Sequence, residues 1–192
     1  MSGPLLEVDG ISLSFKGVKA ITDVSFKVGE GELYAIIGPN GAGKTSIFNS
    51  ISQVYRPQEG DIRWKGESIM GQRPDHIAAM GIARTFQNIE LFPHMTVLEN
   101  LLLGRHIRMK TSWLAGALWL GPAKREEMAN RRAVEDIIDF LEIERWRRHP
   151  VALLPYGFQK RVELGRALAM QPELLMLDEP VAGMNLEETE DM

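Results

Sequence analysis

The stretch Gly38-Pro39-Asn40-Gly41-Ala42-Gly43-Lys44-Thr45 lies between an apolar run, Leu33–Ile37, and the segment Ser46–Ile51. The apolar run predicts a buried strand, and Ser46–Ile51 predicts the start of a helix. A phosphate-binding loop requires this context of strand, loop and helix. The alternative, a glycine-rich turn that matches by chance, does not explain the flanking elements. The stretch therefore predicts a site for a nucleoside triphosphate.

The residue types in this loop suit the binding of an anion. Gly41 and Gly43 allow a tight turn in which successive backbone N–H groups point at one centre. The N-terminus of the following helix adds partial positive charge at the same place. Lys44 is long enough to reach the terminal phosphates, and the Thr45 hydroxyl is a suitable ligand for Mg²⁺.

A second pattern occurs late in the chain, where the apolar run Leu174–Leu177 is followed by Asp178 and Glu179. Ligands of open α/β sheets bind at the carboxyl ends of the strands, where these two acids would lie. We predict that Asp178 holds Mg²⁺, directly or through water, and that Glu179 orients or deprotonates the attacking water. A solvated acidic turn would be an adequate alternative if no phosphate-binding loop preceded it.

The composition narrows the possible classes of protein. The chain has 192 residues, a formal net charge of −4, four histidines and no cysteine. It therefore has no thiol chemistry, and no overall positive charge that would indicate nucleic-acid binding. The start of the chain lacks the pattern of a signal peptide, and the apolar stretch Trp113–Leu120 is too short to span a bilayer. We expect any membrane contact to go through a partner.

Hydrophobic periodicity and turn residues predict an α/β core interrupted by a mainly helical stretch, roughly Asn88–Leu153. The first two strands are joined by a short glycine turn, which predicts an antiparallel hairpin. Thr96 and Glu99 predict a capping box at the start of a helix. The predicted strands are Leu6–Phe15, Ala20–Val28, Leu33–Ile37, Asp61–Lys65, Ile82–Phe86 and Leu174–Leu177, and the predicted helices are Lys44–Val54, Arg73–Met80, Thr96–Leu103, Ala123–Phe140 and Phe158–Met170.

A third motif, Leu154-Pro155-Tyr156-Gly157-Phe158-Gln159-Lys160-Arg161, lies between the other two motifs. It resembles the signature motif of ABC-type ATPases, which is followed by a helix and then by the acidic strand. The order and spacing of the three motifs extend this resemblance over essentially the whole chain. The resemblance implies an α/β fold with a P-loop NTPase core, an N-terminal antiparallel β-subdomain and an inserted helical subdomain.

The resemblance also implies the domain boundaries, the ligands and the site residues. We expect one ABC ATPase domain over residues 1–192, with residues 1–87 and 171–192 as its core and about 88–170 as its helical subdomain, which carries the signature motif. We expect the ligands to be ATP and Mg²⁺. Phe15 matches the aromatic residue that stacks on adenine, and Gln87 matches the glutamine that senses Mg²⁺ and the attacking water. The expected nucleotide-binding residues are Phe15, Gly38, Pro39, Asn40, Gly41, Ala42, Gly43, Lys44, Thr45, Ser46, Gln87, Tyr156 and Gly157; the catalytic residues are Glu179 and Gln87; the Mg²⁺ residues are Thr45, Gln87 and Asp178.

Two features depart from the family pattern. Pro155 replaces the usual signature serine, and it has neither a hydroxyl nor a backbone N–H to offer a phosphate. The family also continues past the D-loop, here Ala182–Asn185, with a strand and a histidine that contacts the γ-phosphate, whereas no histidine follows His149 in this chain. We therefore expect the C-terminal part of the core to lie beyond Met192.

The signature and the segments Ala83–Asn88 and Asp178–Asn185 are similar to those of ATPase subunits of branched-chain amino acid importers. This branch implies a second ABC ATPase subunit (identical or different), two membrane permease subunits and, indirectly, a periplasmic or extracellular binding protein. It implies a peripheral location on the cytoplasmic face of the membrane and no nucleic-acid partner. The alternatives are a urea or amide importer, a soluble ABC ATPase acting on DNA or the ribosome, an unrelated P-loop kinase or GTPase, and a regulatory remnant that does not hydrolyse ATP.

Overall fold

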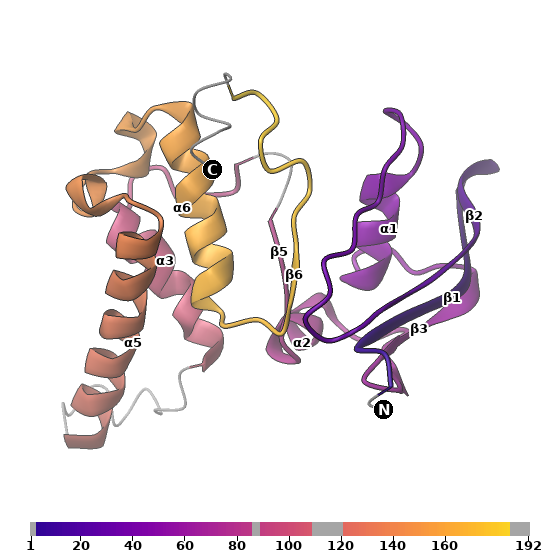
Figure 1. Cartoon of the computed structure of the whole chain (residues 1–192), viewed down its shortest axis with the longest axis horizontal. Helices are drawn as coiled ribbons and strands as arrows, with labels where there is room; N and C mark the ends of the chain where they lie inside the picture. Colours follow the sequence, from indigo (N-terminus) through magenta and orange to yellow (C-terminus); the bar gives the residue numbers. More distant parts are fainter. Residues whose placement is uncertain (1–2, 86–88, 109–120, 185–192) are drawn as a thin grey trace. The chain divides into compact units, whose positions relative to one another are not determined.

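A computed structural model describes residues 3–85, 89–108 and 121–184 (Figure 1). The chain divides into two compact units, residues 1–80 and 81–192. The first unit contains an antiparallel sheet and helix α1, and the second contains a helical bundle and a short parallel strand pair. The phosphate-binding loop belongs to the first unit, whereas the acidic strand and the signature motif belong to the second.

The sheet of the first unit has the strand order β2–β1–β3–β4, and all its pairs are antiparallel. The predicted hairpin is confirmed, because β1 (Leu6–Phe15) pairs with β2 (Val18–Val28). β3 (Glu59–Trp64) lies on the other side of β1, and the sheet ends with β4 (Glu67–Ser68), which the sequence pattern did not predict.

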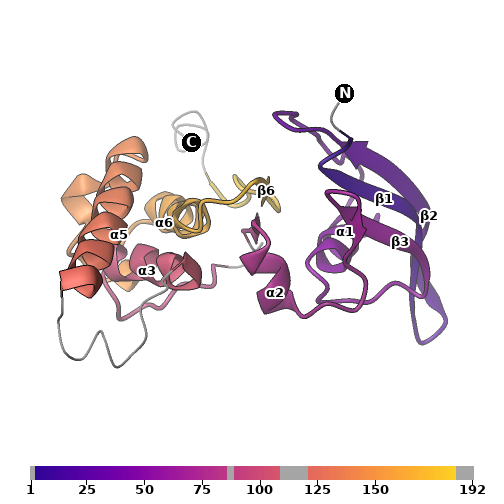
Figure 2. The same cartoon turned by 90° about the horizontal axis from the view of Figure 1, so that it is seen from below.

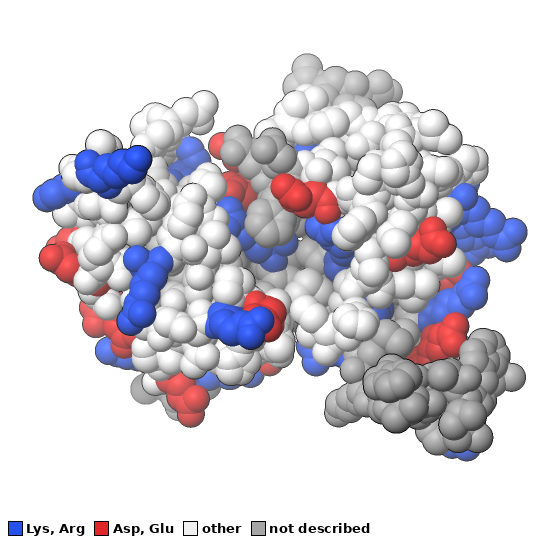
Figure 3. All heavy atoms as spheres, turned by 180° about the vertical axis from the view of Figure 1, so that it is seen from behind, with Lys and Arg blue, Asp and Glu red and all other residues white. Residues whose placement is uncertain are grey.

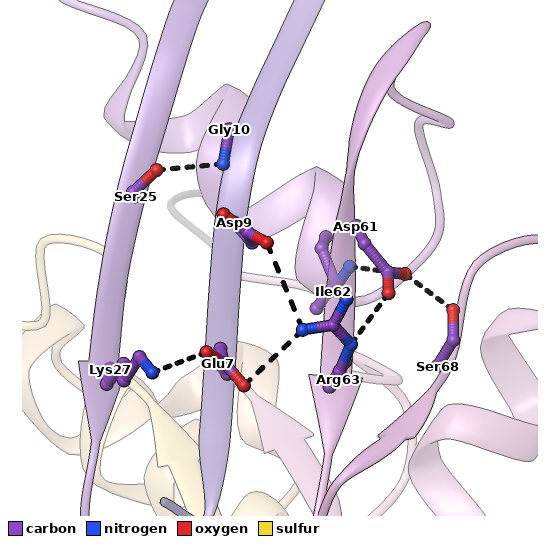
Figure 4. A network of polar contacts seen from close by, with 9 residues as sticks. All are labelled: Glu7, Asp9, Gly10, Ser25, Lys27, Asp61, Ile62, Arg63 and Ser68. Atoms are coloured by element: carbon purple, nitrogen blue, oxygen red, sulfur yellow. Dashed lines mark hydrogen bonds and ion pairs between the residues drawn. The ribbon is translucent and has the colours of Figure 1, made fainter.

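One face of this sheet carries a network of charged side chains (Figure 4). The Glu7 carboxylate forms ion pairs with the Lys27 ammonium on β2 at 2.6 Å and with the Arg63 guanidinium on β3 at 3.6 Å. Arg63 also lies 2.9 Å from Asp61. The pKa of Glu7 is lowered, mainly because Lys27 donates a hydrogen bond to its carboxylate. Cross-strand charge pairs of this kind stabilise the register of neighbouring strands.

The alternate side chains of the sheet form the core of the first unit, as the two-residue period of a strand requires. Helix α1 (Lys44–Ile51) lies beside the sheet in both views (Figures 1 and 2) and ends before the predicted Val54. Helix α2 (Pro74–Ala79) buries Ile77. The buried apolar side chains of the sheet and of α1 are Leu6, Val8, Ile11, Leu13, Ile21, Val28, Ile47, Ile51, Ile62 and Trp64.

The prediction of a buried strand at Leu33–Ile37 is wrong for the structure described here. These residues have no regular secondary structure, and the side chains of Leu33 and Ile37 are 98% and 93% exposed. A strand exists only when another strand satisfies its backbone hydrogen bonds. No described strand of the first unit pairs with this run, so its apolar composition alone does not produce one.

Over its described residues (81–85, 89–108 and 121–184), the second unit contains three α-helices and one pair of parallel strands. Helices α3 (Val97–Arg105), α5 (Gly121–Phe140) and α6 (Tyr156–Ala169) lie side by side (Figure 2). Strand β5 (Ile82–Arg84) pairs in parallel with β6 (Leu174–Met176), as expected for buried α/β strands. Short 3₁₀ turns complete the unit at His106–Arg108 (η1), Glu144–Trp146 (η2) and Val151–Leu153 (η3). Its buried core consists of Val97, Leu101, Val134, Ile138, Leu141, Ile143, Val151, Leu154, Val162 and Ala169.

The predicted capping box at the start of α3 is confirmed. The Thr96 hydroxyl accepts a hydrogen bond from the Glu99 backbone N–H at 3.3 Å, and the Glu99 carboxylate accepts one from the Thr96 N–H at 2.8 Å. The hydrogen bond from the Thr96 backbone is the main cause of the lowered pKa of Glu99. Because the folded-state pKa is depressed, this contribution to stability is present at neutral pH and is lost as the pH falls through that pKa.

Two arginines close the carboxyl end of α6. Arg105 donates to the Ala169 carbonyl at 3.1 Å, and Arg108 donates to the carbonyls of Met170 at 2.9 Å and Gln171 at 2.6 Å. The carbonyls of Ala169 and of the C-cap residue Met170 are among those that a helix end leaves without intrahelical partners. Burial lowers the pKa of Arg105, although a guanidinium remains charged at neutral pH. The two cations therefore stabilise the negative end of the helix dipole.

Helices α3 and α6 approach each other closely at Gly104. A Cβ atom added there would overlap the Arg166 carbonyl oxygen and lie 3.1 Å from the Ala169 Cβ. We expect Gly104→Ala to destabilise the protein by about 1–3 kcal/mol, because overpacking at a backbone contact outweighs the better helix propensity of alanine. Urea unfolding followed by far-UV circular dichroism measures the change. Gly3→Ala is the control, since open space surrounds Gly3; equal stability of the two variants would contradict the prediction.

Candidate functional site

The phosphate-binding loop folds over the side chain of its own lysine. The Lys44 ammonium donates to the carbonyl oxygens of Gly38 at 2.8 Å and Pro39 at 3.1 Å. A further turn closes where the Ala42 N–H donates to the Pro39 carbonyl at 3.1 Å. These bonds hold the positive charge at the mouth of the loop. The Thr45 side chain is exposed there at the first turn of α1.

Gly43 has two reasons to be glycine. It is the N-cap of α1 with a φ of 88°, in the left-handed region. A Cβ on it would also lie 2.5 Å from the Ala20 carbonyl oxygen and 2.6 Å from the Ile21 side chain. Gly41 shares the left-handed backbone, with a φ of 82°, but has open space around it. The first N–H groups of α1 have no carbonyl one turn earlier, so they are available to an anion.

The predicted base-stacking residue, Phe15, ends strand β1 in the same unit. Its side chain is 44% exposed, so part of the ring surface is accessible to a ligand. The ring of Tyr55 lies against it, with the two centroids 4.9 Å apart and the planes at 73°. An exposed aromatic face of this kind can stack on a nucleotide base.

The second unit places Asp178 just after β6, as predicted. Asp178 is 2% exposed, and its carboxylate forms an ion pair of 2.9 Å with the guanidinium of Arg84. Arg84 is the last residue of β5, the strand that pairs in parallel with β6. Its backbone N–H donates to the Thr85 hydroxyl at 3.3 Å. A carboxylate buried without such partners would carry a large desolvation cost. Arg84 and Thr85 therefore determine where the Asp178 carboxylate points.

Glu179 lies in a different environment from its neighbour. Its φ of 50° puts a non-glycine residue in the left-handed region, where the chain leaves the strand. The turn is closed by the Ala182 N–H, which donates to the Glu179 carbonyl at 3.0 Å. Strained backbone of this kind is concentrated at functional sites. Asp178 is buried, whereas Glu179, the first residue of this turn, is only partly buried.

The signature motif starts α6 two residues earlier than predicted, at Tyr156 rather than Phe158. Pro155 is the N-cap residue and offers no side-chain cap, whereas its fixed φ suits the helix start. The Tyr156 hydroxyl donates to the Ala182 carbonyl at 3.2 Å, and its ring lies beside Gly183. The start of the signature helix thus contacts the turn that follows Glu179.

Helix α6 also buries a pair of oppositely charged side chains. Lys160 and Glu163 are 3.3 Å apart, and each side chain is 2% exposed. They line a small pocket together with Thr85, whose hydroxyl accepts the hydrogen bond of the Asp178 N–H. The pocket is lined by Thr85, Lys160, Glu163, Leu164, Leu177 and Pro180.

The predicted site residues fall into three groups according to where they lie in the structure. Gly38–Ser46 and Phe15 lie in the first unit, and Tyr156, Gly157, Asp178 and Glu179 lie in the second, where Tyr156 contacts the turn that follows Glu179. Gln87 lies outside the described residues. The sequence analysis assigned no role to Arg84, Thr85, Lys160 or Glu163. A signal for the last two was present, because two opposite charges three residues apart lie on the same face of a helix.

Oxygen donors of the type that Mg²⁺ prefers are present in each unit. The cation prefers hard oxygen ligands and binds proteins through one or two carboxylates together with substrate phosphates. The first unit offers the Thr45 hydroxyl, and the second offers the Asp178 carboxylate. Within the described ranges there is no cluster of three or more His, Cys, Asp or Glu residues that would hold a metal without a phosphate.

Comparison with known proteins gives a consistent result. The family described as ABC transporter matches residues 21–182. The chain is 43% identical, over 100% of its length and 75% of the relative, to the high-affinity branched-chain amino acid transport ATP-binding protein BraF of Pseudomonas aeruginosa. It is 40% identical, with the same coverage, to LivG of Escherichia coli K12, which has the same description. The crystal structure of the ADP conformation of MJ1267, an ATP-binding cassette of an ABC transporter, superposes with a TM-score of 0.81 and 32% identity, over 98% of this chain and 74% of that one. None of the helices described in the present structure is both long and apolar enough to cross a membrane.

Proposed function

Because this chain belongs to the ABC transporter family, we propose that it is the ATP-binding and ATP-hydrolysing subunit of an importer of branched-chain amino acids. The family and the α/β fold predicted from the motifs are confirmed. The observation that carries the proposal is the identity of 43% over the whole chain to an ATP-binding protein of branched-chain amino acid transport. A urea or amide importer remains the alternative.

The loop geometry supports a role in phosphate binding. The turn at Gly41–Gly43 and the N-terminus of α1 present backbone N–H groups to the phosphates, and Lys44 contacts the terminal ones. Phe15 stacks on the base. The exposed Thr45 hydroxyl and the buried Asp178 carboxylate are the Mg²⁺ ligands, together with Gln87. The residues of the loop that surround the phosphates are Gly38, Pro39, Asn40, Ala42 and Ser46.

The two acids after β6 have separate tasks. Bound Mg²⁺ neutralises the charge that develops on the phosphates. Asp178 is held by Arg84 at 2.9 Å, which suits a fixed ligand rather than a proton acceptor. Glu179, on the strained turn, orients the attacking water and accepts its proton, and Gln87 assists it.

We infer a dimeric assembly, in which the start of α6 on one subunit faces the nucleotide held by the other. Gly157 and the helix N-terminus supply N–H groups and positive potential, since Pro155 has no N–H to contribute. Tyr156 couples this helix start to the turn after Glu179 through its bond to Ala182. The second ATPase subunit is either a copy of this chain or a related one.

The remaining partners follow from the same proposal. Two permease subunits hold the ATPase at the cytoplasmic face of the membrane, and a binding protein delivers the substrate to them.

One ATPase domain, with residues 1–87 and 171–192 as core and about 88–170 as helical subdomain, stays our prediction of the domain organisation. A protein that binds nucleic acid typically carries a stripe of basic side chains on its surface. On the face shown in Figure 3, the described Lys and Arg side chains are instead interspersed with Asp and Glu.

Copurification and stimulation of ATPase activity test this function. An affinity-tagged form of this protein, extracted from its native membranes in detergent, should bring down two permease subunits. Its ATPase rate should rise severalfold when binding protein loaded with leucine, isoleucine or valine is added to the reconstituted complex. Unloaded binding protein is the control. Stimulation by urea instead would support the alternative importer, and recovery without any membrane protein would contradict an importer.

A further inference from the structure

Tyr55 lies at the junction between the phosphate-binding helix and the exposed Phe15 side chain. Its backbone N–H donates to the carbonyl of Asn49, within α1, at 3.0 Å. Its ring meets the ring of Phe15 edge-on, with centroids 4.9 Å apart. One residue therefore contacts both the helix that starts at the loop and the residue proposed to stack on the base. All of these residues belong to the first unit.

A second set of bonds holds the segment after Tyr55 against the end of β1. The Gln58 side chain accepts a hydrogen bond from the Ser14 N–H at 2.8 Å and donates one to the Ser14 carbonyl at 3.2 Å. The Gln58 N–H donates to the Ser12 carbonyl at 2.9 Å. The Gln58 side chain thus bonds the backbone of β1 next to Phe15, as a neighbouring strand would. Tyr55 belongs to the same segment as Gln58, and its ring lies beside Phe15.

The two rings do not form part of a closed core. Phe15 is 44% exposed and Tyr55 is 36% exposed. With the planes at 73°, Tyr55 contacts Phe15 without stacking on it in parallel. An edge-to-face contact restrains the rotation of a ring while leaving area for another flat group. The contact thus fits a residue that must be exposed and yet held in one orientation.

We propose that Tyr55 is a positioning residue for base binding, because it holds the Phe15 ring in the orientation that stacks on the purine of the bound nucleotide. This inference rests on the proposed function of Phe15. The ligand class is a nucleoside triphosphate, and the stacking contact itself accepts any flat base. Tyr55 acts through Phe15, so its removal affects the recognition of the base and leaves the recognition of the phosphates intact.

The test compares two ligands, ATP and inorganic tripolyphosphate, each with Mg²⁺, by titration calorimetry on the whole chain. Tyr55→Leu should weaken ATP binding about three- to tenfold, the range expected for loss of an aromatic pair. It should leave tripolyphosphate binding unchanged. Tyr55→Phe keeps the ring and should bind ATP within about twofold of the unmodified protein. Phe15→Leu should weaken ATP binding about ten- to a hundredfold, again without an effect on tripolyphosphate.

The outcomes separate this inference from the proposed function. Phe140→Leu, a matched change at an exposed aromatic residue in the second unit, should leave both affinities unchanged. If Phe15→Leu lowers ATP affinity and Tyr55→Leu does not, the inference is overturned and the proposed role of Phe15 stands. Equal loss of ATP and tripolyphosphate binding in Tyr55→Leu would show general damage to the unit and would also overturn it. An unmodified protein that binds neither ligand would contradict the proposed function itself.

Discussion

Lys44→Ala should lower the affinity for MgATP by about a hundredfold, the loss expected when a charge-assisted contact to phosphate is removed. The Lys44 ammonium is already held at the mouth of the loop by the carbonyls of Gly38 and Pro39, at 2.8 and 3.1 Å. A cation fixed in this way costs little further ordering when a phosphate arrives. The alanine variant loses this charge and also the two bonds that close the loop over it.

Titration calorimetry with MgATP measures this effect. Lys27→Ala is the matched control, because it removes the same side chain from the charged face of the sheet, where Lys27 pairs with Glu7. The control should keep the affinity of the unmodified protein. If Lys44→Ala binds MgATP as tightly as the control does, the stretch Gly38–Thr45 is not a phosphate-binding loop.

Glu179→Gln should leave MgATP binding intact and lower the turnover of the assembled transporter by a factor of about 10²–10⁴, the range for loss of a general base. The change keeps the size of the side chain and its place on the turn after β6, but the amide cannot accept the proton of the attacking water. Asp178 cannot replace it, since its carboxylate is 2% exposed and paired with Arg84. The defect should therefore appear in the rate and not in the binding of nucleotide.

Single-turnover hydrolysis in the reconstituted complex isolates the chemical step. Glu173→Gln makes the same substitution at an exposed position just before β6 and should hydrolyse ATP at the normal rate. A Glu179→Gln variant with near-normal turnover would show that another group activates the water. Weakened MgATP binding in this variant would instead indicate that Glu179 contributes to the nucleotide site.

Local patterns predicted the parts of the structure that depend on neighbouring residues. The tight turn at Gly41 and Gly43, the capping box of Thr96 and Glu99 and the turn of the β1–β2 hairpin are all decided within a few residues. Short apolar runs between turn signals also predicted the strands β5 and β6, although not their pairing with each other.

The parts that were missed or wrong depend on residues that lie far apart in the chain. Leu33–Ile37 has the composition of a strand, but composition does not supply a pairing partner. The ion pair of Arg84 with Asp178 joins residues 94 positions apart, and only the parallel strand pair brings them together. The contact of Tyr55 with Phe15 likewise depends on the path of the chain after α1, which no local pattern reveals.

The close approach of Gly43 to strand β2 limits how this protein can diverge. Every replacement of glycine adds at least a Cβ, which at this position meets the Ala20 carbonyl oxygen at 2.5 Å. No compensating change in a side chain can relieve an overlap with backbone, so a substitution would require the strand itself to shift. Gly41 has open space, and asparagine, which tolerates the left-handed region, is an accessible replacement there. Two glycines of one loop therefore differ in mutational tolerance. Position 41 can accept other residues during evolution, whereas position 43 allows only glycine.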